Sequence, residues 1–181
     1  METNVSQLLK SPVGSIQNFN IDGLVDIVGE KKSLVKGKVR LMRTGRGILV
    51  EGDLQTEVEV GCSRCLNLYP CPLKFRIAEE YYPTVDLETG SPLSAPDDTV
   101  CFSIDANHVL DLTEAVRQYA LLAIPMKPLC RKECAGLCPV CGKGLNYGAC
   151  DCPVDEVDPR WAGLEELVSK GRLASEDIER N

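Results

Sequence analysis

The chain has 181 residues, of which 44% are hydrophobic and 26% are charged, and its formal net charge is −7. This composition is ordinary for a globular protein with one core and a small appendage, and the acidic balance argues against a surface wrapped in nucleic acid. No run approaches the roughly 18 apolar residues of a membrane helix, and residues 1–15 do not read as a secretory signal. We therefore expect a cytoplasmic protein, in which thiols stay reduced.

Two strands joined by a tight turn form the clearest predicted element. Residues 33–43 and 48–60 alternate between apolar and polar side chains, which is the period of a half-buried strand, and TGRG at 44–47 supplies the turn. Gly52 is the expected bend in the longer strand. The side chains that we expect in the core are Val35, Val39, Leu41, Ile48, Val50, Leu54, Val58 and Val60.

Two further strands and a helix are predicted after this hairpin. Residues 69–77 and 99–104 alternate, and an acidic loop rich in Pro and Ser separates them. Residues 111–124 have an apolar stripe at helical spacing, with Asp111 as the expected N-cap and Glu114 completing a capping box.

The expected fold class is α+β. Residues 1–125 should form an antiparallel β meander or partial barrel packed with the helix at 111–124, because the sheet must cover its apolar face. Residues 126–181 should form a small cysteine-rich zinc-binding tail and a short C-terminal helix, with Asp158 as its N-cap and Pro159 in its first turn.

Six of the ten cysteines lie in one short segment, namely Cys130, Cys134, Cys138, Cys141, Cys150 and Cys152. A reducing compartment disfavours disulfides. CPVCG at 138–142 is a Cys-x-x-Cys knuckle whose two thiolates suit one edge of a tetrahedral Zn²⁺ site, and a segment with so little apolar surface needs a metal to hold its shape. The second pair of ligands is Cys130 with Cys134 or Cys150 with Cys152, and spacing alone does not choose between them.

Cys62 and Cys65 form a second Cys-x-x-Cys pair at a strand end. A thioredoxin-like redox pair would open a helix in a βαβ unit, which the surrounding pattern does not provide. The pair could be half of a second metal site, alone or with Cys71. The interpretation that we favour from the sequence is a tight turn with two small thiols packed inside.

The basic residues of the first strand form a candidate RNA-binding row, which comprises Lys36, Lys38, Arg40, Arg43 and Arg46. Outward side chains on a strand stand about 6.5–7 Å apart, a spacing similar to that of phosphates along a nucleic acid. Two other interpretations remain open: lysines that protect an exposed edge strand, and side chains that pair with the acidic residues at 51–59. The scarcity of exposed aromatic residues disfavours sequence-specific reading of single strands.

Catalysis has few candidates in this sequence. His108 is the only histidine and precedes a predicted helix, where a solvated or capping role is expected. GKGLNYG lacks the spacing and the Lys-Ser/Thr ending of a phosphate-binding loop. We expect a protein that is not an enzyme.

The order of these motifs resembles the YceD family of large ribosomal RNA subunit accumulation proteins. The resemblance covers about residues 20–169 and rests on CSRCL, LLAIPMKPLC, CAGLCPVCGKGLN, CDC and DPRWAGLEEL. It implies an accessory role in the processing or accumulation of large-subunit rRNA, and it carries over no catalytic residues.

Two partners fit this implied role. One is large-subunit rRNA or its precursor particles, contacted through the basic row. The other is a basic ribosomal protein, bound by the acidic stretch at 79–114 and the acidic tail; this partner would suit the net charge of −7 better.

Overall fold

The computed structural model describes residues 1–29, 31–87, 89–93, 102–153, 159–161 and 163–164. Contacts divide the chain into two compact units, Met1–Gly136 and Leu137–Asn181. From the sequence we placed the division after residue 125. The first unit continues to Gly136, and Cys130 and Cys134 lie beside Cys62 and Cys65, in a turn between two of its strands.

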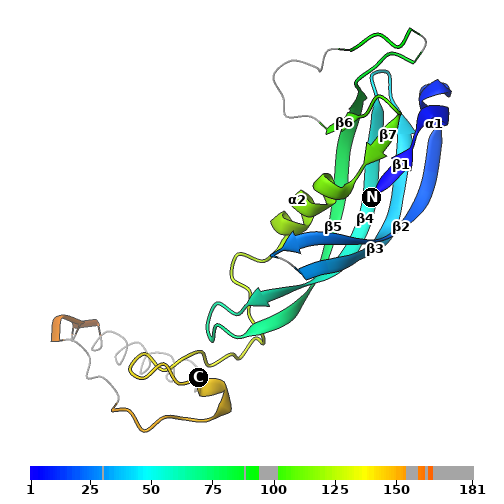
Figure 1. The fold of residues 1–181 in the computed structure, drawn as a ribbon. Coiled ribbons are helices and arrows are strands. Elements are labelled where there is room, and N and C mark those ends of the chain that lie inside the picture. Colours follow the sequence, from blue (N-terminus) through cyan, green and yellow to red (C-terminus); the bar gives the residue numbers. More distant parts are fainter. Residues whose placement is uncertain (30, 88, 94–101, 154–158, 162, 165–181) are drawn as a thin grey trace, which may run out of the picture. The chain divides into compact units, whose positions relative to one another are not determined.

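The strands of the first unit form one seven-stranded sheet that curls into a half-barrel, in the order β1-β7-β6-β5-β4-β3-β2 (Figure 1). The first-unit elements are β1 (Glu2–Asn4), α1 (Ser6–Lys10), β2 (Ile16–Val28), β3 (Lys31–Arg43), β4 (Ile48–Gly61), β5 (Leu68–Pro83), β6 (Phe102–Ile104), β7 (Val109–Asp111) and α2 (Thr113–Ala123).

The expected meander holds from β2 to β5, where each strand is antiparallel to the next one along the chain. The chain then departs from that pattern. Strand β6 runs parallel to β5, β7 is antiparallel to β6, and β1 is antiparallel to β7. Of the strand expected at 99–104, residues 99–101 lie outside the described part of the chain.

Strand β2 was missing from our sequence-based expectation. Its inward positions include Phe19, Ile21, Val25 and Ile27, and the last three are buried. This alternation was readable in the sequence. Polar and glycine positions interrupt its apolar pattern, so the signal was weaker than that of β4.

The core lies on the concave side of the sheet, and the prediction of its strand residues is confirmed. Each of the eight side chains expected there is buried, from Val35, Leu41, Ile48 and Val50 at 0% exposed to Val60 at 8%. Helix α2 covers this face by packing against β5 and β2 (Figure 1). It buries Ala115, Val116 and Ala120. The sheet thus uses α2 to shield its apolar side from water.

Two glycines permit close approach of the strands at the middle of the sheet. A Cβ atom on Gly52 would lie 2.8 Å from Val39 Cγ2 and 3.0 Å from the Lys38 carbonyl oxygen. A Cβ atom on Gly37 would overlap the carbonyl oxygen of Asp53. Only glycine fits at these positions, as is common where a sheet curls.

The capping box expected at α2 is wrong. The N-cap residue is Leu112, which lies at the position before Thr113 and forms no side-chain cap hydrogen bond, so the prediction of Asp111 as the N-cap is wrong. Asp111 lies one residue earlier, and its Oδ1 accepts a hydrogen bond from the Thr113 amide at 2.9 Å. Glu114 does not reach back to the cap. Its carboxylate instead accepts hydrogen bonds from the Arg117 guanidinium at 2.8 and 2.9 Å.

The described part of the second unit contains two 3₁₀ turns, η1 (Leu145–Tyr147) and η2 (Pro159–Trp161). The helix that we expected after Asp158 is represented by η2 and by residues 163–164, while Asp158 and residues 165–181 lie outside the described residues. Among the described helices, none is long and apolar enough to span a bilayer.

Candidate metal centres and the basic strand

Four cysteines of the first unit bring their sulfurs together, and we call them cluster 1: Cys62, Cys65, Cys130 and Cys134. The first two lie in the turn between β4 and β5, and the other two lie in the segment that follows α2. All four Sγ atoms lie within 4.8 Å of one another. Cys62, Cys65 and Cys134 are buried, and Cys130 is half-buried. This arrangement could hold one metal ion.

The turn at Cys62 has the backbone form of a metal-binding knuckle. The Cys62 amide donates to the Asn67 carbonyl oxygen at 3.0 Å, and the Leu66 amide donates to the Cys62 carbonyl oxygen at 2.9 Å. To close this turn, Leu66 adopts a positive φ of 61°. Both cysteines therefore face the same side of a tight loop.

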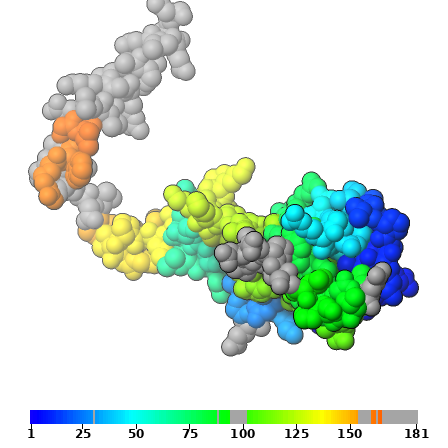
Figure 2. All heavy atoms as spheres, turned by 90° about the horizontal axis from the view of Figure 1, so that it is seen from above, coloured from blue at the N-terminus to red at the C-terminus, as the bar shows by residue number. Residues whose placement is uncertain are grey.

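The segment after α2 is tied to that loop by polar contacts. The Ser63 amide donates to the Pro128 carbonyl oxygen at 2.8 Å, and Arg64 Nη1 donates to the Cys134 carbonyl oxygen at 2.9 Å. Gly136, with φ of 76°, passes so close that a Cβ atom would lie 3.2 Å from the Arg64 carbonyl oxygen. Figure 2 shows the two segments in contact, with the yellow atoms after α2 against the blue-green atoms of the turn.

The second unit contains cluster 2, which comprises Cys138, Cys141, Cys150 and Cys152. Its sulfurs also lie within 4.8 Å of one another. Cys138 is buried and Cys141 is exposed, while the other two are half-buried. Cluster 2 could therefore hold a second metal ion at a more accessible position than cluster 1.

The knuckle of cluster 2 repeats the hydrogen bonds of cluster 1. The Cys138 amide donates to the Lys143 carbonyl oxygen at 2.8 Å, and the Gly142 amide donates to the Cys138 carbonyl oxygen at 2.9 Å. Gly142 has a φ of 72°. The Val140 amide lies 3.4 Å from Cys138 Sγ, the kind of contact that disperses thiolate charge.

Backbone amides favour one thiolate in each cluster. The N–H of Cys130 is the largest influence that lowers the pKa of Cys62 to about 6. The N–H of Cys141 is the largest influence that lowers the pKa of Cys138 to about 6. The first cysteine of each knuckle is therefore favoured as a thiolate, which is the form that binds a cation.

The partner pairs contain thiols that hold their protons more tightly. Burial, followed by the neighbouring thiols, raises the pKa of Cys130 to about 12. A hydrogen bond with Cys141, followed by burial, raises the pKa of Cys152 to about 12. A bound cation would displace these protons, so metal binding at either cluster would release protons.

The structure distinguishes the two candidate partner pairs that the sequence offered for Cys138 and Cys141. Cys138 and Cys141 lie with the downstream pair, Cys150 and Cys152. The upstream pair joins the turn at Cys62. Cys71 is buried in the hydrophobic core and is not one of the four cysteines of cluster 1. Cys101 lies outside the described residues.

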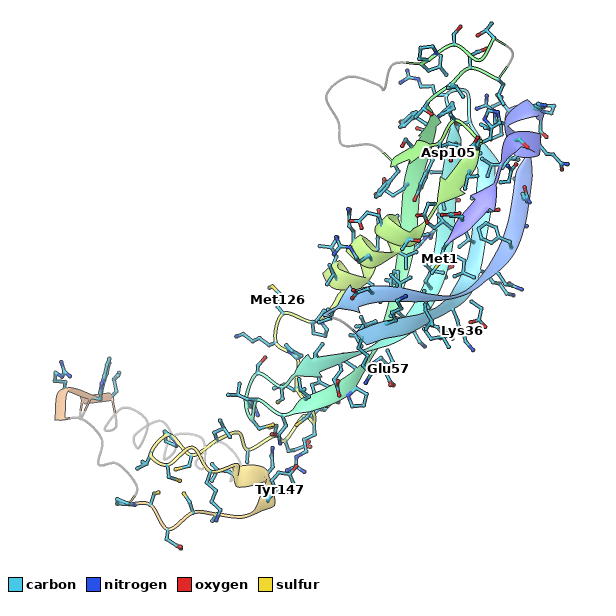
Figure 3. The ribbon with its side chains drawn as sticks, in the orientation of Figure 1. Met1, Lys36, Glu57, Asp105, Met126 and Tyr147 are labelled. Carbon is cyan, nitrogen blue, oxygen red and sulfur yellow. The ribbon has the colours of Figure 1, made fainter. Side chains whose placement is uncertain are left out.

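The basic row lies on the convex face of an interior strand. Lys36, Lys38 and Arg40 are all exposed, and Lys36 projects from β3 on the side away from α2 (Figure 3). Strand β3 lies between β2 and β4, so it is not an edge strand and the edge-protection interpretation is wrong.

Acidic neighbours flank the row but pair with it only in part. Lys36 Nζ lies 3.6 Å from an Asp22 carboxylate oxygen of β2. In the register of β3 with β4, Lys38 faces Asp53 and Arg40 faces Glu51. Within the described residues neither Lys38 nor Arg40 forms an ion pair, and Glu51 pairs with Arg76 of β5 at 3.1 Å instead.

The last two members of the row differ from each other. Arg43 is held by the chain: its guanidinium donates to the carbonyl oxygens of Leu9 at 3.2 Å, Thr44 at 2.7 Å and Gly47 at 2.8 Å. Arg46 is exposed at the turn. Arg43 therefore braces the hairpin, and its placement does not favour the RNA contact that we expected.

The described acids of the stretch at 79–114 are largely engaged within the first unit. Glu79 accepts a hydrogen bond from the Tyr119 hydroxyl at 2.7 Å. Glu80 accepts one from the Thr44 hydroxyl at 2.6 Å. Asp105 accepts from the amides of the β6–β7 turn at 2.7 and 2.9 Å. His108 lies in that same turn with a φ of 59°.

Comparisons with known proteins identify one matching family and several relatives. The family model described as "Large ribosomal RNA subunit accumulation protein YceD" matches residues 50–168. Uncharacterized protein YlbN of Bacillus subtilis is 27% identical over 181 residues, which cover 94% of this chain and 98% of that protein. Uncharacterized protein Rv2926c of Mycobacterium tuberculosis is 28% identical, covering 81% and 68%.

A plant protein also matches. The Arabidopsis thaliana protein named large ribosomal RNA subunit accumulation protein YCED homolog 1, chloroplastic, is 26% identical over 156 residues. The match covers 74% of this chain and 48% of that protein. No solved structure gives a significant match.

Proposed function

This chain belongs to the YceD family, and on that premise we propose that it is a non-enzymatic accessory factor in large ribosomal subunit biogenesis, which supports the accumulation or processing of rRNA. The one histidine, His108, lies in a strand turn with a buried Nδ1 atom that has no hydrogen-bond partner among the described residues, a setting that does not resemble an acid–base pair.

The observation that carries an RNA contact is the exposed row on β3. Lys36, Lys38 and Arg40 are at alternate positions of β3, so their Cα atoms follow one another at about 6.5–7 Å along the strand and all three side chains project from the same face. Lys38 and Arg40 are free of ion pairs to described residues and can bind phosphates without first breaking one. These three residues are the proposed contact.

The neighbouring acids define how RNA would lie on this face. Asp53 and Glu51 stand beside the row on β4, so a broad duplex surface would be repelled there. A single phosphate backbone that follows β3 avoids that cost. The proposed contact is therefore narrow, insensitive to base sequence and strongly dependent on salt.

We assign Zn²⁺ to cluster 2, where it has a structural role. Four thiolates form the donor set of closed structural zinc sites. Val140, Tyr147 and Trp161 are exposed, so the described part of the second unit has little apolar burial to hold its shape.

A basic ribosomal protein is the second candidate partner. It is supported by the exposed acids of β4, among which Glu57 is labelled on the convex face in Figure 3. The acids at 79–98 that the structure describes support it less, because Glu79 and Glu80 already accept hydrogen bonds within the unit.

The test is charge reversal at the proposed contact. The variant Lys36→Glu, Lys38→Glu, Arg40→Glu should fold normally and should lower the log–log salt slope for large-subunit rRNA binding by about three, which is about one per lost contact. A matched control reverses the exposed Lys10, Lys127 and Lys132 for the same change in net charge. It should leave the slope within the error of the unmodified protein.

An unchanged slope in the β3 variant would overturn the RNA contact. If that variant still recovers a basic ribosomal protein from purified ribosomal proteins, and reversal of Asp53 and Glu57 to Lys abolishes that recovery, the protein partner replaces RNA in the proposal.

A further inference from the structure

The sulfurs of cluster 1 are spaced as the ligands of a single ion. Cys62 Sγ lies 3.7 Å from Cys134 Sγ, and Cys65 Sγ lies 3.7 Å from Cys130 Sγ. A regular tetrahedron of sulfurs at about 2.3 Å from Zn²⁺ has edges of about 3.8 Å. Each short distance joins one sulfur of the turn to one of the segment after α2, so both pairs contribute to the same tetrahedron.

These distances exclude covalent pairing. A disulfide requires sulfurs about 2.05 Å apart, and neither pair is near that value. Four thiols in mutual contact also differ from ordinary packing, in which a buried free cysteine behaves as a small apolar side chain.

The segment that supplies Cys130 and Cys134 has little else to hold it. From residue 121 to residue 133 no side chain is buried, and Met126 is 95% exposed. Cys134 is the first buried side chain after Ala120. Of the segment after α2, Ile124 packs partly against the core, but residues 125–133 bury no side chain fully. Ordering such a segment costs conformational entropy, which a metal ion bound by Cys130 and Cys134 would offset.

The turn itself adopts an unfavourable backbone form. Leu66 has a φ of 61°, which costs an L-residue energy, and it is 70% exposed, so burial of its own side chain does not offset that cost. A bound ion would offset this cost, because the turn brings Cys62 Sγ and Cys65 Sγ within 4.8 Å of each other and of the sulfurs of Cys130 and Cys134.

We infer that cluster 1 is a second structural Zn²⁺ site, separate from cluster 2, that fastens the segment after α2 to the turn between β4 and β5. The chain accordingly binds two zinc ions in two four-thiolate sites. Zn²⁺ is chosen because four thiolates in a tetrahedron, three of them buried, favour a soft cation with no open position for water.

The first measurement is the metal content of the full chain purified without chelator. Native mass spectrometry and elemental analysis should find two zinc ions per chain. Cys65→Ser and Cys130→Ser should each lower the count to one, and so should Cys141→Ser in cluster 2. Cys71→Ala, which removes a buried cysteine outside both clusters, should leave two.

The second measurement uses hydrogen exchange to identify the segment that loses protection when one ion is lost. Cys65→Ser and Cys130→Ser should expose the Ser63 amide, which donates to Pro128, and should speed exchange across residues 126–134. Cys141→Ser should leave these amides as protected as in the unmodified protein. Both readouts are independent of RNA binding.

Three results would overturn the inference. One is a single zinc ion in the unmodified protein that disappears in Cys141→Ser and persists in Cys130→Ser. Another is iron in place of zinc, which elemental analysis identifies. The third is full protection of the Ser63 amide after chelation of all metal. If Cys65→Ser fails to fold, the unmodified protein and Cys130→Ser still decide the question.

Discussion

Leu66 and Gly142 occupy equivalent positions in two knuckles of different units. Each amide donates to the carbonyl oxygen of the cysteine four residues earlier, at 2.9 Å in both turns. Each residue has a left-handed φ, 61° for Leu66 and 72° for Gly142. The knuckle of cluster 2 therefore has glycine, which a left-handed φ favours, whereas the knuckle of cluster 1 forms the same turn with a leucine.

This relationship predicts opposite effects of two exchanges. Leu66→Gly should stabilise the first unit by about 0.5–1 kcal/mol, because glycine relieves the left-handed strain at some cost in chain entropy. Gly142→Ala should weaken the turn of cluster 2. Urea unfolding measures the first effect, and zinc retention against a chelator measures the second.

Gly45→Ala is the control for added bulk in a turn, because a Cβ atom there meets nothing within 4 Å and its φ is not left-handed. A loss of stability in Leu66→Gly would show that the leucine side chain makes a contact of value despite being 70% exposed.

The two clusters should release metal at different rates. A chelator should remove zinc first from cluster 2, where Cys141 is exposed, and later from cluster 1, where three of four cysteines are buried. Release followed with a colorimetric chelator should be biphasic. Cys141→Ser should lack the fast phase and Cys130→Ser the slow one; a single phase in the unmodified protein would contradict the assignment.

We expect Arg43 to contribute to the free energy of unfolding and not to rRNA binding. Arg43→Met removes charged hydrogen bonds to three carbonyl oxygens and should cost about 2 kcal/mol of unfolding free energy. Its rRNA salt slope should be unchanged. Arg46→Met, at the exposed turn, should change stability by less than about 0.5 kcal/mol. Denaturant unfolding and filter binding at several salt concentrations check both variants.

Val58 tests the assignment of the sheet faces. Val58→Asp should destabilise the first unit by several kcal/mol, because it places an unpaired carboxylate at a position that is 2% exposed. Gln55→Asp adds the same group to the exposed face of the same strand and should be nearly neutral. Equal melting temperatures for the two variants would show that the buried and exposed faces of β4 are assigned wrongly.

Prediction from the sequence was most accurate for strands in which apolar and polar side chains alternate over many residues. The inward side chains of β3 and β4 were identifiable because alternation over many residues allows only one face to be apolar. Strand β2 was missed because glycine and asparagine positions dilute the same signal, and the parallel pairing of β6 with β5 depends on a long connection that local patterns do not describe.

Cluster 1 could not be assembled from the sequence. Cys65 and Cys130 are 65 positions apart, and their meeting depends on how the sheet and α2 place the two loops. The downstream site was easier because Cys138 and Cys152 lie in one short segment with a glycine-bearing knuckle. Leu66 concealed the matching knuckle, because a leucine gives no hint of a left-handed turn.

The position of β1 imposes an order on the synthesis of this protein. Strands β2 to β5 can pair as each one leaves the ribosome, whereas Glu2 pairs with Asp111 and must wait for it. At roughly 5–20 residues per second, that wait is on the order of ten seconds. The segment that is made first thus docks only after strands β2 to β6 have been made, and a nascent chain halted before β7 would carry a meander whose N-terminal strand still lacks its partner.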